Sequence, residues 1–434
     1  MLLIRCISIL VILPFLLSTL TLAQVPLPLD PLVPVPSSKP LPGANQGVVP
    51  VSIKSSEAPR RIGASFDENK FTPLQKQFFQ SGKSGADWLY RMNTVKGRFI
   101  NGIRPALKVE MEEENFIHQT IAALALARAA RIYKDDRFAV RASQAILLLL
   151  EETMMDPKNP SARYTVMPTQ ILDRQMSAGL MLLAICELPN PKADLLEAGE
   201  QFASYLKTTL QETSGIDKEF TVEEFDSKGS ESAIAIAALL KSNQLMPMPW
   251  KVEVAKKAII TRWNAWKTQK DVAPSAWRIL ALNEAYKSGN EKAYAELAFE
   301  IADRLSTLQY DQIDPRKPGW YGGMKNFSTH SNEHMPTVTT CILAESFAVV
   351  CQCAQLAADI SRHEKYLLKL EQALQFCQTI QYNDSNTLHY SDWFRPRLLG
   401  GFYKSAQDGD LRLDYTSHCV AAYTMYLQVC PIGS

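Results

Sequence analysis

Apolar segments alternate with amphipathic segments from residue 114 to residue 429. The amphipathic segments, such as residues 291–308, place apolar and charged residues at helical spacing, as a helix with one buried face does. A helix that is apolar on every side must instead be surrounded by protein or lipid. The alternation therefore predicts inner helices, each preceded by an outer helix. The predicted inner helices cover residues 116–130, 176–187, 231–240, 276–286, 338–358 and 415–428.

The predicted outer helices complete a series of helical hairpins. They cover residues 72–92, with a break at Gly82 and Gly85, and residues 137–152, 192–211, 250–267, 291–308 and 363–381, while residues 97–109 are predicted to be extended. The repeats begin at uneven intervals, which argues against a solenoid of fixed period. We therefore predict an all-α fold, an (α/α)6 barrel. In a closed ring the outer-to-inner connections open at one end, including the two long inserts, residues 309–336 and 382–413.

This pattern resembles the six-hairpin, or (α/α)6-barrel, superfamily, which includes many glycoside hydrolases, polysaccharide lyases and sugar epimerases. The resemblance covers residues 72–429 and is one of architecture. Residues 97–119, with the alanine-rich segment that follows, and residues 400–418 are also similar to secreted bacterial proteins of this shape that lack an assigned activity. Members of the superfamily use different residues for different reactions, so the resemblance assigns no catalytic role.

The N-terminal segments of the sequence predict where the protein is sent. Residues 1–23 contain Arg5, an apolar run and a small-residue cleavage sequence ending at Ala23, as an export signal does. The apolar run is shorter than the ~20 residues of a membrane span, although an uncleaved anchor is an alternative. Residues 24–63 are rich in proline and predict an extended linker. Residues 64–434 then form one large domain, in a secreted or periplasmic protein without a membrane span after cleavage.

Composition excludes several classes of partner. The net charge is +1, with 46 basic and 45 acidic residues and no long run of either sign, so no surface for nucleic acid is expected. No nucleotide or cofactor motif is present, and we expect no cofactor. The cysteines are predicted to pack as small apolar residues, with a bridge between Cys353 and Cys377 as an alternative. The oligomeric state is not predicted.

The starts of the inner helices carry candidate acid–base residues. Glu114 and His118 are four residues apart on one helical face, and so are Asp414 and His418. If the ring closes between its sixth and first inner helices, these two pairs become neighbours. Such groups can exchange protons with a sugar, although acids at helix starts also serve as caps and histidines can be structural. The candidate catalytic residues are Glu114, His118, Asp173, Asp414 and His418.

Aromatic and charged side chains at the same end are candidates for substrate binding. Flat aromatic rings pack on sugar rings, although each ring could also anchor a long loop. The candidates are Arg174, Glu231, Trp277, Arg278, Trp320, Tyr321, His334, Trp393, Arg412 and Tyr415. Residues 330–334 spell an inverted zinc-peptidase motif, but glycine and proline surround it and no helical period supports it. We therefore predict no metal site, and a loop that contributes His334 or Glu333.

Two functions remain open from the sequence. The first is a secreted carbohydrate-active enzyme of glycosidase, lyase or epimerase type that works by general acid–base catalysis. The second is a non-catalytic toroid that binds a glycan or the cell envelope. The enzyme hypothesis requires at least two of the named carboxylates or histidines within about 10 Å of each other across one open cavity.

Overall fold

The computed structural model describes residues 68–112, 115–166, 174–212, 230–268, 272–326 and 334–431. All of them belong to one compact unit, Glu57–Ser434. The predicted export signal, the proline-rich linker, Glu114, Asp173 and residues 330–333 lie outside the described residues.

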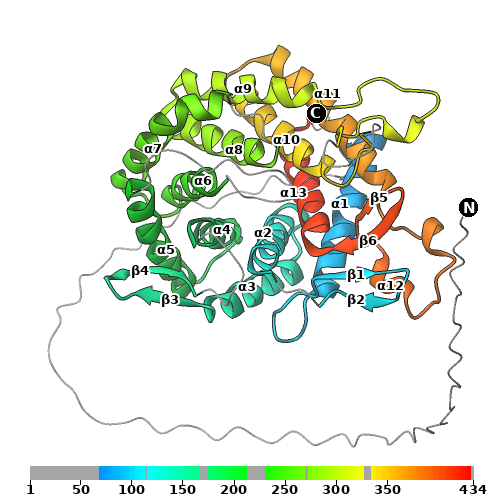
Figure 1. Cartoon of the computed structure of the whole chain (residues 1–434), viewed down its shortest axis with the longest axis horizontal. Coiled ribbons are helices and arrows are strands. Elements are labelled where there is room, and N and C mark those ends of the chain that lie inside the picture. The colour runs from blue at the N-terminus through cyan, green and yellow to red at the C-terminus, as the bar shows by residue number, and fades with distance from the viewer. Residues whose placement is uncertain are drawn as a thin grey trace, which may run out of the picture. The chain divides into compact units, whose positions relative to one another are not determined.

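Six inner helices form a closed ring in this unit (Figure 1). Each contacts its two neighbours, and the last contacts the first. Their side chains are buried on nearly all sides, as their apolar sequences predict. In ring order they are α2 (Phe116–Tyr133), α4 (Arg174–Glu187), α6 (Glu231–Asn243), α8 (Val272–Gly289), α10 (Thr340–Leu356) and α13 (Leu413–Val429).

Outer helices surround the ring and bury one face against it. They are α1 (Pro73–Met92), α3 (Asp136–Leu150), α5 (Ala193–Glu212), α7 (Pro249–Thr268), α9 (Lys292–Ser306) and α11 (Ile360–Thr379). The pairing differs from the sequence prediction, because each inner helix packs mainly on the outer helix that follows it. Short turns join these partners. The last inner helix, α13, packs instead on α1, the first outer helix, and this contact closes the outer layer.

The predicted break in the first outer helix is wrong. Helix α1 runs without interruption through Gly82 and Gly85, and it starts with a capping box between Thr72 and Gln75. The two glycines lie where α1 meets α13: a Cβ at Gly82 would lie 2.7 Å from Cβ of Tyr423. The absence of a side chain therefore lets the first and last helices approach closely, and this packing outweighs the weak helix propensity of glycine.

Two small sheets lie in the long connections, so the fold is not purely helical. The first has the strand order β2–β1–β6–β5, and the second pairs β3 with β4, all antiparallel. Their bounds are β1 (Gly102–Arg104), β2 (Val109–Glu110), β3 (Thr153–Asp156), β4 (Asn159–Thr165), β5 (Tyr403–Ser405) and β6 (Asp408–Arg412). The prediction that residues 97–109 are extended is confirmed at β1 and at the first residue of β2.

The remaining helical pieces are short and lie outside the ring of hairpins. They are η1 (Glu68–Lys70), η2 (Pro318–Trp320), η3 (Ser385–Thr387) and α12 (Arg395–Leu398). In the part of the chain that the structure describes, no helix combines the length and the apolar character needed to cross a membrane.

Candidate active site

The inner helices all begin at the end of the ring that carries the long connections. Short turns, such as residues 134–135 and 290–291, lead from an inner helix to the next outer helix. Longer segments, such as residues 93–115 and 380–412, lead back to the next inner helix. Loops on a rigid scaffold can vary without loss of the fold, so this end is suited to binding.

Hydrogen bonds from the connection between α1 and α2 join the first and last inner helices at this face. The Gln119 side chain exchanges hydrogen bonds with the backbone of Phe99, 2.8 Å each, and donates to Oδ1 of Asn101. The Asn101 carbonyl in turn accepts a hydrogen bond from the backbone N–H of Leu413. Strand β1 also pairs with β6. These contacts hold the start of α13 beside the start of α2.

His118 and Asp414 meet at this junction. Nε2 of His118 lies 3.6 Å from Oδ2 of Asp414. Arg412 donates two hydrogen bonds to the same carboxylate, 3.1 Å from Nε and 2.8 Å from Nη2, and its Nη2 lies 3.5 Å from the His118 ring. The guanidinium also lies over the ring of Tyr415, 4.7 Å from its centroid. The separation of His118 and Asp414 is therefore well below the limit of about 10 Å that the enzyme hypothesis sets.

A second histidine–carboxylate pair lies one turn further along α13. Nδ1 of His418 lies 2.5 Å from Oε1 of Glu345, which projects from α10. Glu345 is not among the residues predicted from the sequence. The signal was present, because Glu345 is the single charged residue of the apolar segment 338–358, and a buried charge requires a partner. The junction of α10, α13 and α2 therefore carries two such pairs.

Neighbouring charges hold Asp414 in its ionised form. The side chain is 1% exposed, and burial raises its pKa. The charges of His118, Arg412 and His418, together with the Arg412 hydrogen bond, lower the pKa by more than burial raises it. The net pKa of Asp414 lies below its usual value. Asp414 therefore orients its partners as a carboxylate and is poorly suited to donate a proton.

His418 is held in its protonated form. Only 7% of this residue is exposed, and burial lowers its pKa. The Glu345 carboxylate, through its charge and its hydrogen bond, and the charge of Asp414 raise the pKa by more than burial and Arg128 lower it. The net pKa lies above its usual value, so His418 can supply a proton near neutral pH.

Four other predicted binding residues lie at the starts of inner helices. Arg174 is exposed and lies over the ring of Tyr164, 4.6 Å from its centroid. Glu231 is the partly exposed first residue of α6. Trp277 and Arg278 are buried in the first turns of α8. They are placed at the same end of the ring as the histidines.

The residues predicted in the two long inserts lie among loop and outer-helix residues. Trp320 packs on Tyr310, and the Tyr321 hydroxyl accepts a 2.9 Å hydrogen bond from Gln372 of outer helix α11. His334 Nδ1 lies 3.2 Å from the carbonyl oxygen of Asn326. These contacts anchor the fifth connection to the ring.

Trp393 differs from the other aromatic candidates because it is 65% exposed. Its ring packs against the buried Phe394, and Nζ of Lys108 lies 6.0 Å from its centroid. An exposed indole next to a cation can pack on a sugar ring.

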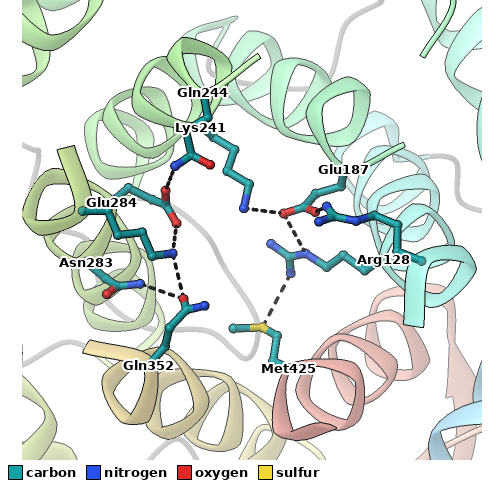
Figure 2. Close-up of polar contacts among 10 residues, drawn as sticks. Arg128, Glu187, Lys241, Gln244, Asn283, Glu284, Gln352 and Met425 are labelled. Atoms are coloured by element: carbon teal, nitrogen blue, oxygen red, sulfur yellow. Dashed lines mark hydrogen bonds and ion pairs between the residues drawn. The ribbon is translucent and has the colours of Figure 1, made fainter. Parts of the chain in front are cut away.

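A second polar cluster, which we call the interior network, lies inside the ring toward the C-terminal ends of the inner helices (Figure 2). Its side chains project from five inner helices toward the ring interior. Their sequence signal is a few charged positions in otherwise apolar helices, and these positions are not among the site residues predicted from the sequence. The members are Arg128, Arg131, Glu187, Lys241, Gln244, Asn283, Glu284, Lys287 and Gln352.

Glu187 and Glu284 organise the interior network. Glu187 pairs with Arg131 and, at 3.1 Å, with Lys241. Glu284 accepts hydrogen bonds of 2.6 Å from Gln244 and 2.7 Å from Lys287. Burial raises the pKa of both carboxylates, but the surrounding cations lower it by more, so both pKa values lie below the usual range. Both carboxylates are therefore ionised, and they join neighbouring inner helices.

The cysteines and the potential metal ligands of the described residues are two further groups that the sequence predictions cover. The seven cysteines of the described segments are buried free thiols, as expected for packing residues. No group of three or more histidine, cysteine, aspartate or glutamate residues is placed to hold a metal ion in the described part of the chain.

Comparisons with known proteins identify the fold. No protein-family model matches the chain, and no curated protein matches it by sequence. Among solved structures, it is similar to an unsaturated glucuronyl hydrolase specific for heparin, with a TM-score of 0.57 and 13% identity over 82% of this chain and 98% of that one. It is also similar to a sugar epimerase from a ruminal bacterium, with a TM-score of 0.58 and 11% identity over 82% of this chain and 100% of that one.

A third similar structure contains an oligosaccharide. It is an inactive variant of the alpha-1,6-mannanase GH76A of Salegentibacter sp. HEL1_6 in complex with alpha-1,6-mannotriose, with a TM-score of 0.54 and 10% identity over 81% of this chain and 99% of that one. The chain thus has the six-hairpin fold, which it shares with carbohydrate-active hydrolases and epimerases. At these identities the likeness extends to the fold alone.

Proposed function

We propose that the protein is a carbohydrate-active enzyme that transfers protons to and from a sugar at the junction of α10, α13 and α2. The observation that carries this proposal is the pair of histidine–carboxylate contacts, His118 with Asp414 and His418 with Glu345. A carboxylate that orients a histidine is the usual arrangement for a general acid or base. The export signal expected in residues 1–23 supports a secreted or periplasmic location for this activity.

The geometry suggests different roles for the two histidines. His418, whose pKa is raised, serves as the general acid, and Glu345 positions it. His118 serves as the general base, held by Asp414. Arg412 lies beside both His118 and Asp414 and can stabilise negative charge that develops on the sugar.

Proton transfer at a sugar carbon, as in an epimerase or a lyase, fits these roles better than hydrolysis. A glycosidase needs a carboxylic acid that keeps its proton until the leaving group departs. Among the candidate carboxyls that the structure describes, Asp414 is held ionised and Glu345 is engaged with His418, so neither is suited to this role. Histidines, by contrast, exchange protons readily near neutral pH.

The test is turnover of a panel of neutral and uronic-acid mono- and oligosaccharides. Nuclear magnetic resonance in deuterated water detects exchange at a sugar carbon, ultraviolet absorbance detects unsaturated products, and reducing-end assays detect hydrolysis. We expect exchange or elimination in the wild type and a loss of roughly 10²- to 10⁴-fold in His418→Gln, because a general acid contributes that much. The exposed His389 provides the matched control variant, His389→Gln.

Retention of full activity by His418→Gln would remove this histidine from the mechanism, and release of reducing ends as the sole reaction would contradict the proposed reaction class.

The exposed indole of Trp393 favours a second candidate, a non-catalytic glycan-binding toroid. That function predicts glycan binding without turnover in the wild type, and unchanged binding in His118→Gln and His418→Gln.

A further inference from the structure

Arg128 differs from the other cations of the interior network in its position along its helix. Arg131, Lys241 and Lys287 lie in the last turns of α2, α6 and α8, where the helix dipole favours positive charge. Arg128 lies more than a turn before the end of α2, and its guanidinium reaches into the ring interior (Figure 2). The helix dipole therefore does not account for a cation at this position.

The contacts of Arg128 are weak for a buried guanidinium. The residue is 8% exposed. Its Nε lies 3.8 Å from Oε1 of Glu187, beyond hydrogen-bond distance, and its Nη1 lies 3.8 Å from the thioether sulfur of Met425. A thioether is a weak acceptor, whereas a guanidinium carries five N–H donors. Within the described segments, Arg128 donates no hydrogen bond to an oxygen. Its nitrogen atoms are not among the fully buried ones that lack a partner, so the remaining N–H groups are open to solvent or a ligand.

The surroundings of Arg128 favour an added negative charge. The interior network contains four cations and two carboxylates, and Glu187 is already paired with Arg131 and Lys241. Lys241 approaches the same Oε1 atom of Glu187 as Arg128 does, so the two cations lie close together. Lys241 keeps 17% of its side chain exposed while it points into the ring, which indicates that solvent reaches this region.

We infer that Arg128, with Lys241 beside it, binds an oxyanion on the sugar substrate, either a carboxylate or a sulfate or phosphate ester. This inference rests on the carbohydrate site proposed above. A planar guanidinium pairs with such an oxyanion through two parallel hydrogen bonds, which supplies the acceptors that Arg128 otherwise lacks.

Arg128 lies on the same side of the ring as the proposed catalytic histidine. Met425, which contacts Arg128, follows His418 by seven residues on α13, or roughly 10 Å along the helix axis. Arg128 also exerts a direct electrostatic effect on His418. A substrate whose anionic group binds Arg128 therefore extends along the ring axis toward the histidine pairs.

Calorimetric titration of the full chain tests this site. The probes are glucuronate, glucose 6-sulfate, glucose 6-phosphate and glucose, so that carboxylates, the two esters and a neutral sugar are separate arms. We expect the wild type to bind at least one anionic sugar more tightly than glucose. Arg128→Gln removes a charged hydrogen-bonding group and is expected to weaken that binding roughly 10- to 100-fold, while the affinity for glucose stays unchanged.

Two further variants make the result specific. Arg128→Lys keeps the charge but not the paired donors, so an intermediate loss is expected. Arg98→Gln removes a cation that pairs with Glu152 outside the ring, and it is expected to leave anionic binding unchanged. If Arg128→Gln fails to fold, Arg128→Lys still reports on the site, because full retention of anionic affinity by that variant counts against paired hydrogen bonding.

Equal affinity of the wild type for glucose and for every anionic sugar overturns the inference, and so does unchanged anionic binding in Arg128→Gln. The proposed function fails separately. If anionic sugars bind through Arg128 but no sugar is turned over, the proposed enzymatic function is contradicted and the oxyanion site is supported. If sugars are turned over with no preference for anionic ones, the proposed enzymatic function is supported and the oxyanion site at Arg128 is rejected.

Discussion

At the residue scale, the most informative side chain is a buried histidine that carries a charge. Burial disfavours the protonated form of His418, yet Glu345 at 2.5 Å and the nearby Asp414 reverse the effect. A buried ion pair adds little net stability but is costly when one partner is removed. Two oppositely charged groups retained inside an apolar ring are therefore better explained by function than by stability.

The raised pKa of His418 predicts how stability depends on pH. Because the folded state binds this proton more tightly than the unfolded state, the contribution of His418 is fully present below about pH 6.5, the unfolded value. It is lost as the pH rises through the higher folded-state pKa. Urea unfolding at a series of pH values should show this loss in the wild type and not in His418→Gln. A pH profile shared by both proteins would contradict the assignment.

The sequence could identify some residues of the site but not others. A charged residue and a histidine four residues apart recur at two predicted helix starts. This pattern made it possible to predict His118, Asp414 and His418 from the sequence. Glu345 is the single charged residue of its apolar segment, and Arg128 has only another cation, Arg131, three residues away. A pattern of acid–histidine pairs within one helix could therefore not reveal them. Their partners come from other helices, and the sequence gives no distance between helices.

At the element scale, the inner helices were predictable because burial on all sides leaves an unbroken apolar sequence. The pairing of hairpins was not, since either neighbour in the chain can cover an inner helix. The break assigned to Gly82 and Gly85 failed for a related reason: glycine weakens an isolated helix, but here it is required by the approach of a helix from the other end of the chain.

The close contact at Gly82 predicts the effect of adding a methyl group. A Cβ there would collide with Tyr423 and with the hydroxyl of Tyr133. We expect Gly82→Ala to lower the free energy of unfolding by about 1–3 kcal/mol, the usual effect of overpacking, although alanine favours an isolated helix. Gly319 is the matched control, because a Cβ at that position meets nothing within 4 Å. Thermal and urea unfolding would measure both, and a stabilised Gly82→Ala variant would show that α1 and α13 are less tightly packed.

At the scale of the whole molecule, the interior network joins helices that the apolar contacts alone would allow to slide. Glu187 of α4 pairs with Arg131 of α2 and with Lys241 of α6, so one carboxylate links three consecutive inner helices (Figure 2). Ion pairs and hydrogen bonds are directional, so they fix the position of each helix along the ring axis. Apolar side chains of similar size do not specify that position.

Removing this carboxylate should therefore be severe. Glu187→Gln leaves buried cations without their counter-charge, and we expect the free energy of unfolding to fall by about 3–5 kcal/mol. Glu152→Gln removes an ion pair with Arg98 that is partly exposed, and a change of less than about 1 kcal/mol is expected. Denaturant titration of the two variants side by side gives the comparison. Equal losses would mean that the interior network does not stabilise the ring.

The contact of α1 with α13 has a consequence for when the protein can work. The pairing of β1 with β6 and the packing of α1 on α13 both require residues 408–429, more than 300 residues after α1. A chain that ends before residue 413 has neither a complete ring nor the partners of His118 and Glu345. Late, long-range pairing of this kind is slow and leaves apolar surface uncovered meanwhile. The proposed site therefore forms only after residues 413–429 have been made and packed on α1, which delays the proposed activity without a separate inhibitor.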